Sequence, residues 1–183
     1  GRLAERVIVP SRPVGDALRD YLAPHGPCPP VSVVHHGCIV PSNGPASMGN
    51  LALDAPYFVI LGTIEPRKNH LLLLNLWRQM AMEGGTTPLP HLVIIGRRGW
   101  ENENILDMIE RCPALQGVVH EHATLSDQAV AGLVRGARAL LFPSFAEGFG
   151  LPLLEALAMG VPCLCSDLPV FREIAGDLPV YLD

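Results

Sequence analysis

The chain has 183 residues, of which 49% are hydrophobic and 17% are charged, which is enough to bury one substantial core. The formal net charge of −5 argues against a nucleic-acid-binding surface, and no apolar run reaches the length of a membrane span. Five cysteines occur without a Cys-x-x-Cys pair, so a disulfide scaffold is disfavoured and a reducing compartment is expected.

Residues 1–50 form a group that differs from the rest of the chain. An apolar run at residues 7–11 predicts a strand, and residues 13–22 predict a helix. Residues 24–30 are rich in proline and glycine and predict a connector, followed by a strand at residues 31–34. Residues 44–50 are expected to form a flexible loop.

The remainder of the chain alternates short apolar runs with stretches of helical periodicity. Strands are expected at residues 57–62, 91–96, 117–120, 138–142, 162–165 and 179–182, and helices at residues 69–82, 102–111, 126–136, 152–159 and 170–175. This alternation predicts an α/β fold, a Rossmann-like parallel sheet with helices on both faces. Ligands of such sheets bind outside the C-terminal strand ends, which directs attention to the loops after Gly62, Gly96, His120 and Phe142.

The segment from residue 143 to residue 160, PSFAEGFGLPLLEALAMG, carries the most information about function. Its glycines let the backbone approach a ligand closely, Pro152 suits the first turn of a helix, and Gly160 suits the position that ends one. The free N–H groups at such a helix start attract anions such as phosphate. Glu147 and Glu155, eight residues apart, are suited to hold hydroxyl groups beside that anion.

A second candidate segment, GTIEPRKN at residues 62–69, follows the first strand of the alternating series. Arg67 offers a planar fork and Lys68 a mobile point charge, so the two could neutralise a diphosphate. Fixed cations that stabilise a leaving diphosphate more strongly in the transition state than in the substrate would contribute to catalysis.

Together these segments resemble the retaining glycosyltransferases of family 4, also called the glycosyl transferases group 1, which have the GT-B fold. Residues 147–155 match the E-x7-E signature, residues 62–69 match the G-x-x-x-x-R-K-N donor loop, and residues 166–177 match the pattern that follows the signature. The resemblance covers residues 30–183. It implies that residues 41–183 form the C-terminal nucleotide-sugar-binding domain, and that residues 1–40 are the tail of a missing N-terminal domain with its linker strand.

The resemblance also implies roles for individual residues. Arg67 and Lys68 would contact the donor diphosphate, Glu147 would lie beside the donor sugar, and these three would be the catalytic residues. Glu155 would accept hydrogen bonds from the ribose hydroxyls. The remaining substrate contacts would come from Gly62, Arg97, Ala123, Leu125, Gly148, Phe149, Gly150 and Leu151, with the base near the loops of Arg97 and of Ala123 and Leu125.

The function implied by the resemblance is transfer of a hexose, with retention of configuration, to a glycan or lipid-linked acceptor held mostly by the missing domain. The donor loop looks most like those of bacterial mannosyltransferases in polysaccharide and lipopolysaccharide biosynthesis, so GDP-mannose is favoured over a UDP-hexose. The resemblance implies neither a metal nor another cofactor. It implies a cytoplasmic protein that contacts the inner face of the membrane, and a fragment that binds nucleotide without transferring sugar.

Two other functional classes remain open from the sequence. A nucleotide-sugar epimerase of the same fold would need acid-base groups beyond Glu147, and a phosphorylase would need a lysine for pyridoxal phosphate although Lys68 is the only lysine. A non-catalytic nucleotide-sugar-binding module would use the same contacts without turnover. No G-x-G-x-x-G fingerprint of a nicotinamide site is present. The nucleotide base, the donor sugar, the acceptor, the linkage and the oligomeric state are not determined by the sequence.

Overall fold

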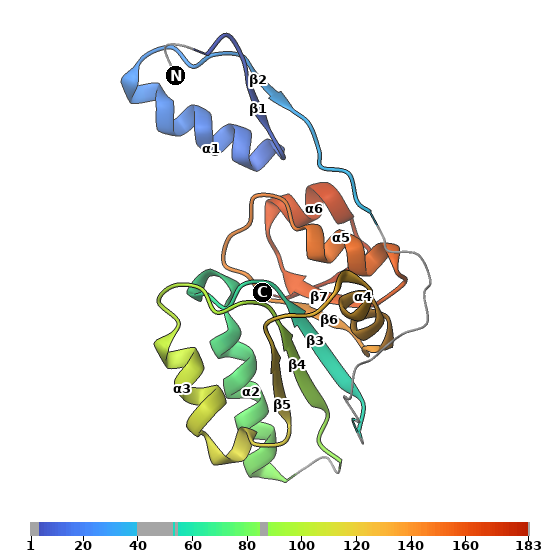
Figure 1. Ribbon diagram of the computed structural model, residues 1–183. Coiled ribbons are helices and arrows are strands. Elements are labelled where there is room, and N and C mark those ends of the chain that lie inside the picture. The colour runs from blue at the N-terminus through green and yellow to red at the C-terminus, as the bar shows by residue number, and fades with distance from the viewer. Residues whose placement is uncertain (1–3, 40–52, 54, 85–87, 183) are drawn as a thin grey trace.

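The computed structural model describes residues 4–39, 53, 55–84 and 88–182. Within them, six strands form a parallel sheet in the order β5-β4-β3-β6-β7-β8 (Figure 1). The strands are β3 (Tyr57–Leu61), β4 (His91–Ile95), β5 (Val119–His122), β6 (Leu140–Phe142), β7 (Cys163–Ser166) and β8 (Val180–Leu182). Because every strand of this sheet is parallel, helical crossovers must cover its faces.

Two layers of helices cover the sheet, as the alternating pattern predicts. One face carries α2 (His70–Glu83) and α3 (Glu103–Arg111), and the other carries α4 (Asp127–Gly136), α5 (Leu151–Ala158) and α6 (Pro169–Ala175) (Figure 1). Short 3-10 turns occur at Ala23–His25, Pro66–Lys68 and Pro113–Leu115. The predicted Rossmann-like fold class is confirmed.

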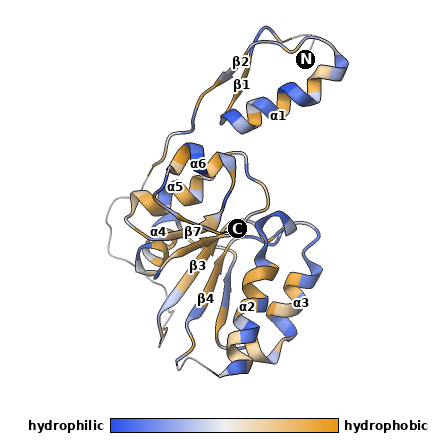
Figure 2. Cartoon of the chain, turned by 180° about the vertical axis from the view of Figure 1, so that it is seen from behind, coloured by the Kyte–Doolittle hydropathy of each residue, from blue (hydrophilic) through white to orange (hydrophobic). Residues whose placement is uncertain are grey.

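Two hydrophobic cores lie on opposite faces of the sheet, because successive side chains of a strand alternate between its faces. In β3, Val59 joins the core beneath α4, α5 and α6, whereas Ile60 joins the core beneath α2 and α3. Figure 2 shows that the central strands of the sheet consist largely of apolar residues. Cys163 and Cys165 are both buried in the core beneath α4, α5 and α6.

The N-terminal residues form a separate small unit. Here β1 (Val7–Val9) pairs in parallel with β2 (Val31–Val33), and α1 (Arg12–Leu22) connects them (Figure 1). This unit contacts α6 and the preceding glycine loop, where the Ser11 hydroxyl donates to the Gly148 carbonyl at 2.8 Å. The expected domain boundary after residue 40 and the expected loop at residues 44–50 lie outside the described residues. No helix of the described ranges combines the length and apolar character needed to cross a bilayer.

Candidate functional site

The two loops singled out by their sequence meet at the point where the strand order reverses. β3 lies between β4 and β6, so the loops after β3 and β6 leave the same edge of the sheet beside the crevice where such folds bind ligands. The Phe145 N–H donates to the Arg67 carbonyl at 2.9 Å, and the Arg67 guanidinium donates to the Ala146 carbonyl at 2.8 Å. These bonds hold the cationic loop against the glycine-rich loop.

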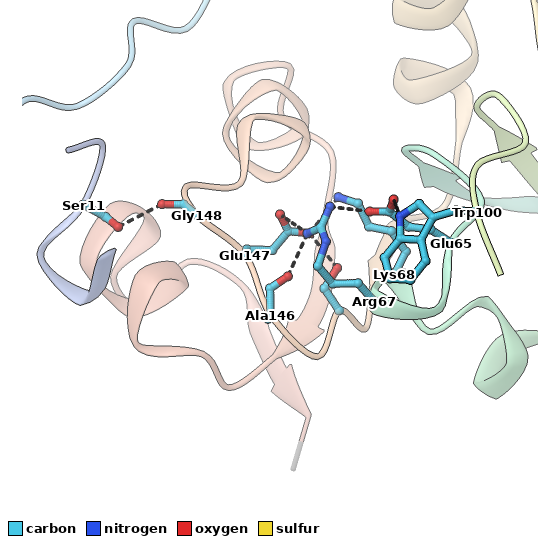
Figure 3. A network of polar contacts seen from close by, with 9 residues as sticks. Ser11, Glu65, Arg67, Lys68, Trp100, Ala146, Glu147 and Gly148 are labelled. Atoms are coloured by element: carbon cyan, nitrogen blue, oxygen red, sulfur yellow. Dashed lines mark hydrogen bonds and ion pairs between the residues drawn. The ribbon is translucent and has the colours of Figure 1, made fainter. Parts of the chain in front are cut away.

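The charged side chains of the two loops form one polar network (Figure 3). The Glu147 carboxylate pairs with Lys68 Nζ at 2.6 Å and with the Arg67 guanidinium at 2.8 Å. It also accepts a hydrogen bond from the Ser144 hydroxyl at 2.9 Å. The Lys68 and Glu147 side chains are only 9% and 8% exposed. Paired charges are therefore assembled here at low solvent exposure, where electrostatic interactions are strong.

A second carboxylate extends this network toward the loop after β4. Glu65 pairs with Arg67 at 2.5 Å, and its other oxygen accepts from the Trp100 indole N–H at 3.1 Å (Figure 3). Burial opposes the Arg67 charge, but Glu147 and Glu65 outweigh that effect and raise the pKa of Arg67. The role of Glu65 was missed from the sequence, although the residue lies inside the donor-loop motif.

His70 is a further buried group that the sequence did not reveal. It begins α2 directly after Asn69, it is fully buried, and neither ring nitrogen has a hydrogen-bond partner among the described residues. Burial and the neighbouring charge of Lys68 lower the pKa of His70 to about 4. The ring is therefore neutral at physiological pH and adds no charge beside the cationic pair.

Glycines allow the backbone to take the shape that the site requires. Gly150 has φ = 106°, and a Cβ atom there would lie 2.8 Å from a ring carbon of Phe171. A Cβ on Gly96 would lie 1.9 Å from the Gly62 carbonyl oxygen, so the loops after β3 and β4 touch through their backbones. A side chain at Gly150 would push the start of α5 away from Phe171 of α6, and one at Gly96 would push the ends of β3 and β4 apart.

Helix α5 connects the polar network to a neighbouring cavity. Its first turn follows Gly150 and contains Pro152, as the sequence predicts. Pro152 has no N–H, and the Leu153 and Leu154 N–H groups donate to the Gly150 carbonyl at 3.1 and 3.3 Å, so this turn offers an anion mainly the positive end of the helix dipole. Glu155 lies one turn further along and lines a cavity of about 340 Å³ between α4 and α5. Burial, and secondarily the charge of Asp127, raise the pKa of Glu155. Asp127 also lines the cavity, and the other lining residues are Ile39, Leu61, Val130, Ala131, Val134, Pro152 and Met159.

The other residues named from the sequence differ in their surroundings. Phe149 is 6% exposed, and the rings of His35 and His36 pack against it at centroid distances of 5.6 and 5.0 Å. Arg97 and Ala123 are exposed, and the Arg97 side chain does not join the polar network. The Gly148 carbonyl accepts a hydrogen bond from the Ser11 hydroxyl. Leu151 is 37% exposed, and Leu125 is partly buried against the core beneath α4, α5 and α6.

Metal-binding side chains do not gather in the described part of the chain. No group of three or more histidine, cysteine, aspartate or glutamate residues there is arranged to hold an ion. His91 and His120 form a pair on neighbouring strands, with ring nitrogens 2.9 Å apart. Positive charge at the candidate site comes from Arg67 and Lys68.

Comparison with known proteins identifies the family. Residues 48–179 match the family described as glycosyl transferases group 1. The chain belongs to this family. The serotype-specific mannosyltransferase WbdA of Escherichia coli is 33% identical over 192 residues, which cover 97% of this chain and 23% of that protein. O-antigen chain mannosyltransferase B of E. coli is 37% identical over 127 residues, covering 69% of this chain and 32% of that protein.

Solved structures confirm the fold of this group 1 member as one Rossmann-like half of a GT-B fold. Sucrose-phosphate synthase from Thermosynechococcus elongatus superimposes with a TM-score of 0.72 at 22% identity, covering 93% of this chain and 42% of that one. HepE from Anabaena, solved with UDP and glucose, also has a TM-score of 0.72 at 18% identity, covering 94% and 47%. The chain spans about a quarter of the length of the WbdA proteins that it matches.

Proposed function

We propose that this chain is the donor-binding domain of a retaining glycosyltransferase that moves a hexose, with mannose favoured, from a nucleoside diphosphate sugar to a glycan or lipid-linked acceptor. The observation that carries the proposal is the junction of the Arg67–Lys68 loop with the Glu147–Gly150 loop at the reversal of strand order. The family membership of the chain supports the same reaction class.

The geometry suits a diphosphate leaving group. When the bond between the sugar carbon and the phosphate oxygen breaks, negative charge grows on the diphosphate. Arg67 and Lys68 lie at the junction, and α5 begins at Leu151 directly after the glycine loop, so the positive end of its dipole adds to their charge. Preorganised charges and dipoles of this kind stabilise the developing charge more than they stabilise the bound substrate.

Glu147 would change partners when the donor binds. Its carboxylate is paired with both cations, and a diphosphate is a stronger competitor for them because it carries more charge. Release would leave Glu147 free to accept hydrogen bonds from sugar hydroxyls, the role expected from the family signature. We expect Glu147→Gln to bind a nucleoside diphosphate without sugar severalfold more tightly, because the competing charge is gone. Titration calorimetry would measure this, and weaker binding would contradict the exchange.

GDP-mannose is the favoured donor because the relatives covering most of this chain carry mannosyltransferase names. A GT-B enzyme places its acceptor between two domains, so acceptor binding belongs to a longer protein than this chain. We predict that the isolated chain binds nucleotide without transferring sugar. We also predict that the full protein works on the cytoplasmic side of a membrane.

The deciding experiment is calorimetric titration of this chain with GDP, UDP and ADP. Binding of at least one nucleotide, lost in Arg67→Ala, supports the proposal, and absence of binding by all three would contradict it. With a longer polypeptide that includes the acceptor domain, proton NMR of the product would test whether the sugar keeps its anomeric configuration. Conversion of the donor to an epimer without acceptor would instead identify an epimerase, and donor binding without either reaction would identify a binding module.

A further inference from the structure

The cavity beside Glu155 contains a second acid whose position bears on the choice of nucleotide base. Asp127 is the first residue of α4 and lines the same cavity as Glu155. Apart from these two acids, every residue that lines the cavity is apolar, and none is basic. A ligand suited to it combines an apolar body with hydrogen-bond donors that face the two acids, as a nucleotide base and its ribose do.

The order of groups along α5 matches the order of parts in a nucleoside diphosphate. Helix α5 begins at Leu151, directly after the glycine loop whose Glu147 pairs with the two cations, and Glu155 lies four residues further, about 6 Å along the helix axis. Glu155 is thus placed for ribose hydroxyls once a diphosphate occupies the junction. The part of the cavity that extends beyond Glu155, toward Val130 and Asp127 of α4, is then left for the base.

We propose that Asp127 is a specificity-determining residue that selects guanine by accepting hydrogen bonds from its N1–H and exocyclic amino group. The inference rests on the proposed nucleotide-binding function and deepens it. Guanine presents these two donors side by side, which matches the two oxygens of a carboxylate. The corresponding edge of uracil has one N–H flanked by two carbonyl oxygens, and that of adenine pairs an amino group with a ring acceptor. A carboxylate meets a lone pair in both of those bases.

The local structure leaves the Asp127 carboxylate available for this contact. The N-cap role at α4 belongs to Ser126, whose hydroxyl accepts from the Ala129 N–H at 3.3 Å. Asp127 is exposed, and the negative charge is favoured at a helix start. The Asp127 carboxylate at the mouth of the apolar cavity can therefore accept two hydrogen bonds without first giving up a structural partner.

The test is calorimetric titration of this chain with GDP, UDP, ADP and inosine diphosphate, which lacks the exocyclic amino group of guanine. We expect GDP to bind at least about fivefold more tightly than the other three, as a two-point contact to a base provides. Asp127→Asn should lower GDP affinity about tenfold, because its amide nitrogen opposes one donor, and should bring GDP and inosine diphosphate to similar affinity. Glu103→Gln, which removes a first-turn acid from α3 instead, should change neither value.

The outcomes separate this inference from the proposed function. Equal affinity for GDP and UDP, or an unchanged preference for GDP in Asp127→Asn, would overturn the role of Asp127 and leave nucleotide-sugar binding intact. Failure of every nucleotide to bind would overturn both. Thermal unfolding of each variant shows whether the fold is kept, and the affinity ratio between GDP and inosine diphosphate within one variant is independent of how much protein is folded.

Discussion

Two ion-pair clusters of this molecule use the same residue types at very different exposure. At the loop junction, Lys68 and Glu147 pair at 2.6 Å with side chains 9% and 8% exposed. At the edge of the sheet, Arg98 pairs with Glu110 and Glu121 at 2.7 Å each, and the first two side chains are 43% and 48% exposed. An exposed pair contributes about 1 kcal/mol or less, whereas removing one partner of a buried pair leaves an uncompensated charge.

The two clusters differ in how much solvation their charged side chains have lost. Desolvating Lys68 and Glu147 costs free energy, so holding both at the strand ends is a feature that stability alone does not favour. Buried, paired charges beside a crevice are a recognisable sign of a functional site. The Arg98 cluster has equally short distances, and its Glu121 side chain is only 14% exposed, but Arg98 and Glu110 are open to water, so their pairing is screened.

The largest effect is expected from Lys68→Met. The substitution leaves the buried Glu147 carboxylate with one cation fewer, so we expect the free energy of unfolding to fall by about 3 kcal/mol. Nucleoside diphosphate affinity should fall about 100-fold. Urea unfolding and calorimetry measure the two effects. Adding Glu147→Met should restore stability without restoring binding, and recovery of both would contradict a ligand-binding role for Lys68.

His70 extends the comparison to a buried group without a charge. With an ordinary pKa of 6.5 and a folded-state pKa of about 4, the unfolded chain takes up the proton first as the pH falls. The stabilisation is therefore complete above pH 6.5 and is lost toward pH 4. Between pH 7 and pH 5 the native chain should lose about 2 kcal/mol more stability than His70→Leu. Equal losses in urea unfolding would show that the imidazole is solvated or protonated in the folded chain.

Arg67→Ala should affect ligand binding more than stability. The Arg67 side chain is 38% exposed, and Lys68 still neutralises Glu147 in its absence. Glu65 loses its cation but keeps the hydrogen bond from Trp100, so the free energy of unfolding should fall by about 1 kcal/mol. Loss of the guanidinium should weaken nucleoside diphosphate binding about tenfold. Calorimetry at low and high salt distinguishes a direct contact between Arg67 and the diphosphate from long-range attraction by the charge of the whole protein. The direct contact persists when long-range attraction is screened by salt.

Arg98→Ala is the matched exposed variant and should have the smallest effect. We expect a change of less than about 1 kcal/mol in the free energy of unfolding and unchanged nucleotide affinity. Urea unfolding and calorimetry of this variant and of Arg67→Ala can be compared directly. A loss of affinity equal to that of Arg67→Ala would show that the two arginine clusters do not differ in function.

Most of the fold was predictable because its signals are local. Apolar runs and helical spacing located every strand and helix of the described residues to within a few positions. The strand expected at residues 117–120 begins two residues later, at Val119. Gly117 takes φ = 78°, a turn conformation that interrupts the extended backbone, and sequence alone does not show whether a glycine will use that freedom.

The candidate site was predictable in place but not in its contacts. The loops after β3 and β6 follow from the sheet rule and from their glycines and cations. The pairing of Lys68 with Glu147 joins residues 79 positions apart, and nothing in the local sequence indicates it. The burial of His70 was missed for the same reason, since a histidine beside Asn69 reads as a surface residue until α2 is packed onto the sheet.

The sequence by itself determined the order of the elements, the loops that carry function and the residue types available there, because periodicity, glycine and proline act on neighbouring residues. Only the tertiary structure decided which charged side chains are buried away from water, and that Arg67 and Lys68 both pair with Glu147. Those properties depend on the dielectric environment and on partners brought in from distant parts of the chain, and they exist only once the sheet has aligned its strand ends.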